Sequence, residues 1–140
     1  MLVRLLYASR AKTLLGDHEL AVILKQSREN NPAEGITGLL CYTDGIFMQV
    51  LEGSRAAVNA RYRLIVEDER HSSVTLMHYE EIGERQFAGW SMGQVNLSRL
   101  NPALVLKYSE TVRLDPYSMS GDALMALFQE LVSSGAIVCG

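Results

Sequence analysis

Hydrophobic and polar positions along the first two thirds of the chain predict alternating strands and helices. Short, nearly continuous apolar runs are typical of strands, whereas apolar side chains that recur every three or four residues indicate helices. Asp17 and Ser54 can cap two helices, Pro32 closes the first, and Asp44-Gly45 between two apolar runs indicates a hairpin. The predicted elements are strands at 2–8, 36–43, 46–52, 74–82 and 87–95, a helix at about 17–30, and a second helix with Val58, Tyr62 and Ile65 on one face.

This order predicts an α+β fold, a ferredoxin-like β-α-β-β-α-β-β sandwich with both helices on one face of the sheet. A C-terminal helical extension follows at 97–140, where Pro102 stands near the start of a short helix. Beyond Ser120, a helical apolar stripe consists of Leu124, Leu127, Phe128 and Leu131. Because the first two helices already cover one sheet face, we expect this stripe to pack on the other face or on a partner chain.

Charge and composition narrow the classes of function. The chain has 13 basic and 16 acidic residues among 140, and its arginines are scattered, so it lacks the basic patch that binds a phosphate backbone. We therefore expect no nucleic-acid partner. The apolar stretches are short and residues 1–5 lack the features of a signal peptide, so we expect a cytoplasmic protein that does not contact a membrane.

Cysteine and histidine spacing does not indicate a metal site. Cys41 and Cys139 are far apart and form neither a redox motif nor a zinc set, so we expect a buried thiol and a frayed tail. The histidines are His18, His71 and His78, and they lack the helical pairing of metal ligands. We expect no metal.

Two hydrolase patterns are weak. Residues 89–93 match G-x-S-x-G, but they lie in an extended run and no histidine follows His78 in the chain, so a nucleophile elbow is excluded. An acylphosphatase-like site needs an anion-cradling loop with an arginine after the first strand. Arg10 is in that region, but the following loop contains only Gly16.

Gln49 and Tyr7 are polar side chains on otherwise apolar strand faces. Gln49 shares its face with Phe47 and Leu51, where a carboxamide must find partners for two donors and an acceptor oxygen. From spacing alone, Tyr7 can also reach water at a strand end and Gln49 can bond a loop carbonyl. Asn31 can likewise be a helix-end residue, and Trp90 and Met92, on one face of the predicted strand, can be core.

Together, Tyr7, Asn31, Gln49, Trp90 and Met92 resemble the BLUF family of flavin-dependent blue-light receptors. The resemblance covers residues 2 to about 96, and the tail is similar to that of short, single-domain cyanobacterial-type members. The matching stretches are LLYAS (5–9), NNPAEGITG (30–38), FMQVLEG (47–53), DERHS (68–72), FAGWSM (87–92), LKYS (106–109) and LDPYSM (114–119).

The resemblance implies a flavin between the two main helices, above the sheet. Tyr7 would donate an electron to the excited flavin, Gln49 would lie between that phenol and the flavin, and Trp90 and Met92 would relay the change. The implied cofactor contacts are Asn31 with Asn30 at the pyrimidine edge, Arg70 and His71 near the open side, and Leu24, Leu39 and Phe47 as apolar walls.

The expected function is therefore a blue-light photoreceptor, not an enzyme, with FAD or alternatively FMN as chromophore. We expect a flavin-binding domain at 1–96, no attached effector domain, and output through 97–140 to a downstream protein, of response-regulator type by resemblance. The resemblance also implies a homo-oligomer. The alternative from the residues alone is a ferredoxin-like ligand-binding or interaction module without photochemistry.

Overall fold

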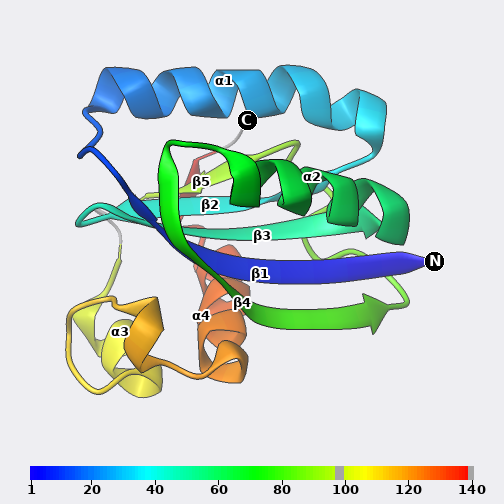
Figure 1. The fold of residues 1–140 in the computed structure, drawn as a ribbon. Coiled ribbons are helices and arrows are strands. Elements are labelled where there is room, and N and C mark those ends of the chain that lie inside the picture. The colour runs from blue at the N-terminus through cyan, green and yellow to red at the C-terminus, as the bar shows by residue number, and fades with distance from the viewer. Residues whose placement is uncertain (97–99, 139–140) are drawn as a thin grey trace.

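The computed structural model describes residues 1–96 and 100–138, which form one mixed sheet with helices on both faces (Figure 1). Within these residues the sheet has six strands in the order β4-β1-β3-β2-β5-β6. The strands are β1 Leu2–Ala11, β2 Thr37–Thr43, β3 Ile46–Ser54, β4 His71–Ile82, β5 Gly93–Val95 and β6 Ile137–Val138. The helices are α1 Asp17–Glu34, α2 Arg55–Glu67, α3 Pro102–Tyr108 and α4 Gly121–Ser133, with a 3-10 turn at Pro116–Ser118.

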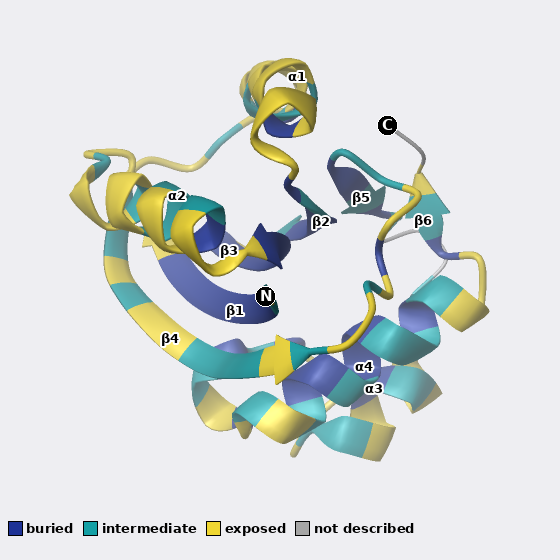
Figure 2. Ribbon diagram, turned by 90° about the vertical axis from the view of Figure 1, so that its right-hand side faces the viewer, coloured by how far each residue is buried: buried dark blue, intermediate teal, exposed yellow. Residues whose placement is uncertain are grey.

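The sheet separates two hydrophobic cores. Helices α1 and α2 cover one face, and α3 and α4 lie on the opposite side (Figure 2). Because successive side chains of a strand point to opposite faces, β1 contributes Leu5 and Tyr7 to the core under α1 and α2, and Leu6 and Ala8 to the core over α4. The apolar stripe of α4 therefore packs on the second sheet face, which is one of the two expected positions.

The central strands of the sheet place the two predicted photoactive residues side by side. Antiparallel pairing of β1 with β3 puts Tyr7 directly opposite Gln49. The hairpin between β2 and β3 turns at Asp44 and Gly45, whose φ angles of 52° and 74° are the positive values that a tight two-residue turn requires. The predicted ferredoxin-like order of the first four strands and two helices is confirmed.

Helix α1 differs from the prediction at both ends. Gly16, not Asp17, is the N-cap residue, and no side chain caps this end. The helix also continues through Pro32 to Glu34. Proline removes one helical hydrogen bond and kinks the helix, and this is tolerated there because Gly35 (φ 68°) closes the helix three residues later in the left-handed conformation, so little helix follows the kink.

The predicted strand at 87–95 is wrong over most of its length, because only Gly93–Val95 form β5, parallel to β2. The start of the segment before β5 is held by a side chain: the Glu52 carboxylate accepts hydrogen bonds from the N–H groups of Gln86 and Phe87. β6, which pairs with β5, has no counterpart in the prediction. β1, β3 and β4 extend the predicted runs by two or three residues at one end, whereas β2 starts one residue later.

The remaining expectations concern the tail, the cysteines and membrane contact. The tail helices begin as predicted: Asn101 caps α3 ahead of Pro102, and the Ser120 hydroxyl accepts a hydrogen bond from the N–H of Ala123 at the start of α4. Cys41 is a buried free thiol, whereas Cys139 lies outside the described residues. None of the helices in the described ranges has the length and apolarity needed to cross a membrane.

Candidate functional site

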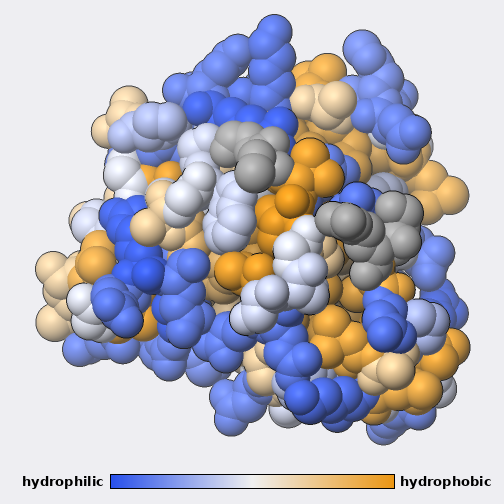
Figure 3. Space-filling model, turned by 180° about the vertical axis from the view of Figure 1, so that it is seen from behind, coloured by the Kyte–Doolittle hydropathy of each residue, from blue (hydrophilic) through white to orange (hydrophobic). Residues whose placement is uncertain are grey.

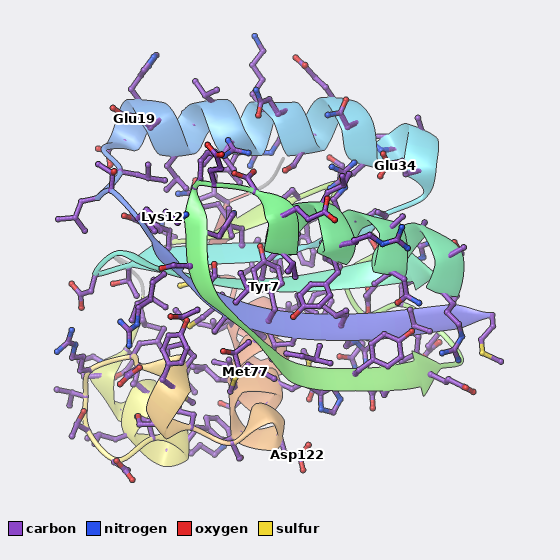
Figure 4. All side chains as sticks on the ribbon, in the orientation of Figure 1. Tyr7, Lys12, Glu19, Glu34, Met77 and Asp122 are labelled. Carbon is purple, nitrogen blue, oxygen red and sulfur yellow. The ribbon has the colours of Figure 1, made fainter. Side chains whose placement is uncertain are left out.

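A cavity of about 130 Å³ lies between the sheet and helices α1 and α2. Its floor comes from β1, β2 and β3, and its sides from the two helices and the start of β4. Tyr7 lies on this side of the sheet (Figure 4). The cavity brings together seven of the residues predicted as site residues: Tyr7, Asn30, Asn31, Phe47, Gln49, Arg70 and His71.

Tyr7 and Gln49, which line the cavity, form a chain of hydrogen bonds with Met92, which is buried in the core beside it. The Tyr7 hydroxyl donates to Gln49 Oε1 at 2.5 Å, and Gln49 Nε2 donates to Met92 Sδ at 3.3 Å. All three side chains are buried. The Gln49 amide therefore has a defined orientation, with its oxygen towards the phenol and its nitrogen towards the thioether.

Burial fixes the protonation state of the phenol. Desolvation raises the pKa of Tyr7 far above its ordinary value, with smaller contributions from Tyr62 and Asp68 in the same direction. Tyr7 is therefore neutral at any physiological pH. Its O–H is available as a hydrogen-bond donor, and loss of its proton requires another event, such as loss of an electron.

His71 lies beside the phenol at the start of β4. Its Nδ1 is 2.7 Å from the Ser9 hydroxyl, and its ring centroid is 4.8 Å from that of Phe47. Burial is the main cause that lowers the pKa of His71, so the imidazole is neutral near pH 7. His71 can therefore act as a neutral polar wall of the cavity.

A charged pair stands at the rim of the cavity. The Arg70 guanidinium donates from Nε to Asp68 Oδ1 and from Nη2 to Asp68 Oδ2, and this hydrogen bonding is the largest cause that lowers the pKa of the Asp68 carboxyl. The carboxylate in turn raises the pKa of Arg70. Both groups are charged at neutral pH, so the rim offers an arginine whose position is fixed.

Helix α1 supplies the amide groups of the opposite wall. Asn31 is buried, and its Nδ2 donates to the carbonyl oxygen of Ser91 at 2.7 Å. This leaves one N–H and the Oδ1 of Asn31 for a group in the cavity. Asn30 is exposed and stands at the rim.

Three predicted site residues lie elsewhere than expected. Leu39 faces the core over α4, because alternation along β2 turns Leu40 into the cavity in its place. Leu24 is buried in the core under α1 but does not line the cavity. Trp90 packs against the core over α4 while Met92 is buried in the other core, so the expectation that both share one strand face is wrong.

Several residues of the helical walls are not among the predicted site residues. Ile23 and Ser27 on α1 and Ile65 on α2 line the cavity. Ile23, Ser27 and Asn30 are spaced i, i+4 and i+7, so a search for one helix face that contains Asn30 would have found the first two. Asp68 also lines the cavity, whereas only Arg70 and His71 of the stretch DERHS (68–72) are predicted as site residues.

The donors and acceptors of the cavity fit a flat aromatic ring with a polar edge. Apolar side chains form much of the lining, which also includes the amide side chains of Asn31 and Gln49. Arg61, which bonds Glu34 on α1 through Nη2, has a buried Nε without a hydrogen-bond partner in the described part of the chain. That donor is available to a bound group, so these residues fit a flavin. The described residues contain no cluster of metal-ligating side chains.

The fold and the site define a flavin-binding sensor domain. The sequence model of the BLUF family, sensors of blue light using FAD, matches residues 2–93, and the chain belongs to this family. FAD is the chromophore of the family. This membership favours the photoreceptor interpretation over a ferredoxin-like module without photochemistry.

Relatives agree with the family assignment. The photoactivated adenylate cyclase subunit beta of Euglena gracilis is 34% identical over 92 residues, which is 65% of this chain and 11% of that protein. The chain thus spans about a tenth of that relative's length. Among solved structures, photo-activated BlsA has a TM-score of 0.82 at 32% identity, covering 94% of this chain and 95% of its own. The BLUF protein BlrB in its dark state has a TM-score of 0.79 at 32% identity, with 96% of both chains covered.

Proposed function

We propose that this chain is a light-driven switch whose moving part is the Gln49 amide. The observation that carries the proposal is the buried chain from the Tyr7 hydroxyl through the Gln49 amide to the Met92 thioether. An amide has a donor end and an acceptor end, so rotating or tautomerising it reverses what it offers to each neighbour. Gln49 therefore has two alternative hydrogen-bond arrangements inside one cavity.

Tyr7 starts the change. A bound flavin supplies absorption of blue light and an acceptor for one electron. Tyr7 releases the electron, and its phenolic proton, which burial otherwise holds tightly, leaves along the bond to Gln49. Both return to Tyr7 afterwards, so the chain is chemically unchanged while the Gln49 amide has rearranged.

The first experiment is a visible absorption spectrum of the protein reconstituted with FAD, recorded in the dark and after blue light. We expect a small red shift of the flavin band that reverts in the dark. A protein that stays colourless after reconstitution, or a band that light leaves unshifted, would contradict the proposal. FMN is reconstituted in parallel to compare the two chromophores.

Two substitutions assign the roles within the pair. Gln49→Leu is expected to bind flavin but lose the normal light-induced shift, because leucine has no hydrogen-bonding groups. Tyr7→Phe is expected to lose the shift because it removes the phenolic proton and the O–H donor. Tyr62→Phe is the matched control, since that ring lies only 5.8 Å from Tyr7 but does not line the cavity. A normal shift in Gln49→Leu would exclude Gln49 as the switch.

We further propose that the output passes by contact with another protein and that the chain itself has no catalytic role. Support comes from the far side of the molecule: Leu106 on α3 and Val112 just after it are exposed, and apolar side chains gather around α3 at the lower right of Figure 3. The partner would be a cytoplasmic signalling protein or further copies of this chain. Measuring mass in solution in dark and in light tests this: an unchanged monomer would exclude the homo-oligomer.

A further inference from the structure

The backbone just before β5 is held by groups outside the strand ladder. Three successive carbonyl oxygens, those of residues 90–92, each accept one hydrogen bond. The pairs are Gly38 N–H to Trp90 at 3.1 Å, Asn31 Nδ2 to Ser91 at 2.7 Å, and Arg28 Nε to Met92 at 3.0 Å. Two of the three donors are side chains of α1, the helix that forms one wall of the cavity.

Arg28 is an unusual donor for this position. It forms no ion pair with a carboxylate of the described residues, and its Nη2 is buried without a partner among them. A buried donor without a partner is unfavourable. Stabilisation of α1 therefore does not explain why an arginine stands at position 28. The bond from the Arg28 guanidinium to the Met92 carbonyl gives this side chain a defined position.

Met92 is held at two points that belong to different parts of the site. Its backbone carbonyl accepts from Arg28 on α1, and its thioether accepts from Gln49 on β3. A methionine side chain is flexible, and sulfur is a weak acceptor. The thioether can favour one orientation of the Gln49 amide only if the Met92 backbone is fixed.

We propose that Arg28 is a positioning residue of the photoswitch. By holding the Met92 carbonyl, it keeps the thioether where Gln49 Nε2 can donate to it, and so favours the dark orientation of the amide. This inference rests on the proposed light-driven rearrangement of Gln49. Its consequence is kinetic: Arg28 speeds the return from the light state.

The test is the rate of dark recovery in Arg28→Gln, followed by visible absorption after a flash of blue light. We expect the red shift to remain and the recovery to slow by about threefold, because a weak hydrogen bond that favours the dark orientation is lost. Lys25→Gln is the matched control, since Lys25 is exposed on the same helix. It is expected to recover at the wild-type rate.

If Arg28→Gln fails to bind flavin, a second variant provides the test. Arg28→Met keeps the aliphatic stem of arginine without its donors. It is expected to slow recovery to the same extent as Arg28→Gln. Arg28→Lys keeps a charged donor and is expected to recover at a rate between those of Arg28→Gln and the wild type. Recovery of Arg28→Gln or Arg28→Met at the wild-type rate, or faster, would overturn the inference.

A double-mutant cycle separates positioning from a general structural role. In a Met92→Leu background the sulfur acceptor is absent, so adding Arg28→Gln should leave the recovery rate unchanged. An additional threefold slowing in that background would show that Arg28 acts by another route. If the wild-type protein itself shows no light-induced shift, the proposed function fails. If only the Arg28 inference fails, the wild-type protein still shows the shift and the recovery rates of the variants are not as expected.

Discussion

Buried polar side chains lie on both faces of the sheet, and the sequence pattern indicates those of one face but not those of the other. Tyr7 and Gln49 stand out in the sequence because an ordinary core would have aliphatic residues at those positions, and the structure places them in contact. Glu52 was not selected from the sequence, because a carboxylate at the end of a strand usually faces water. Its burial depends on Arg4, 48 positions away, and no local pattern reveals that pairing.

Arg4 and Glu52 form a buried ion pair on the face away from the cavity. Glu52 is fully buried and lies 2.8 Å from Arg4 Nη2. Its two oxygens also accept from the N–H groups of Gln86 at 3.0 Å and Phe87 at 2.8 Å. Both oxygens of the carboxylate thus accept hydrogen bonds, and they fix the start of the segment that leads to Met92.

Removing this carboxylate should destabilise the fold strongly. We expect Glu52→Ala to lower the free energy of unfolding in urea by about 3–5 kcal/mol, because Arg4 and two backbone N–H groups lose a buried partner. Glu81→Ala, which breaks the exposed Arg55–Glu81 pair, should cost at most about 1 kcal/mol. Equal losses in the two variants would contradict the structural role given to Glu52.

At the scale of elements, the pattern of apolar positions succeeds where an element is long. It predicts β1, β3 and α4 because an apolar run or an apolar helical stripe continues over many residues there. It fails at 87–92, where apolar side chains recur as in a strand but the backbone groups are bonded by side chains of Glu52, Asn31 and Arg28. Those partners come from distant elements, so local periodicity does not reveal them.

The contact between α4 and β4 depends on one glycine. A Cβ atom built on Gly121 would lie 1.8 Å from the Met77 carbonyl oxygen, an impossible approach to a backbone atom. The absence of a side chain lets the first turn of α4 lie directly against β4. The apolar stripe predicts α4 but not this close approach, because the approach depends on where the helix packs.

Gly121→Ala should therefore loosen the packing of α4. We expect it to lower the free energy of unfolding by about 1–3 kcal/mol, even though alanine favours helices, because the helix must move away from β4. Gly89→Ala is the control, since a Cβ there meets no atom within 4 Å. Urea denaturation followed by circular dichroism measures both, and a stabilised Gly121→Ala would refute the close packing.

At the scale of the whole molecule, one segment connects the two cores. Phe87 belongs to the core over α4, Trp90 packs against that core, and Met92 belongs to the core under α1 and α2. The sequence predicts apolar side chains on both faces of the sheet. The alternation of side chains between the two faces holds only within a strand, so it does not apply to residues 87–92. For this reason the orientations of Trp90 and Met92 had to come from the structure.

The short strands beyond this segment should respond to light. Among the described residues, β5 pairs with β6 at Gln94–Val138 and Val95–Ile137, so this is a short ladder that can open locally. If Gln49 no longer donates to Met92 in the light state, the segment before β5 loses one weak hydrogen bond. We expect amide hydrogen exchange of Gln94 and Val95 to become about fivefold faster under blue light, the effect of about 1 kcal/mol.

The control lies within the same sample. Amides of the central strands β1 and β3, such as Leu6 and Val50, should exchange equally slowly in dark and light, because their ladder does not depend on Met92. Mass spectrometry of peptides after exchange under each condition measures both regions. Acceleration of β1 and β3 as well would indicate global loosening, and no change in β5 would mean that the rearranged amide does not act through Met92. Acceleration confined to β5 and its partner strand is the result expected if the cavity under α1 and α2 communicates with the far face through residues 90–92.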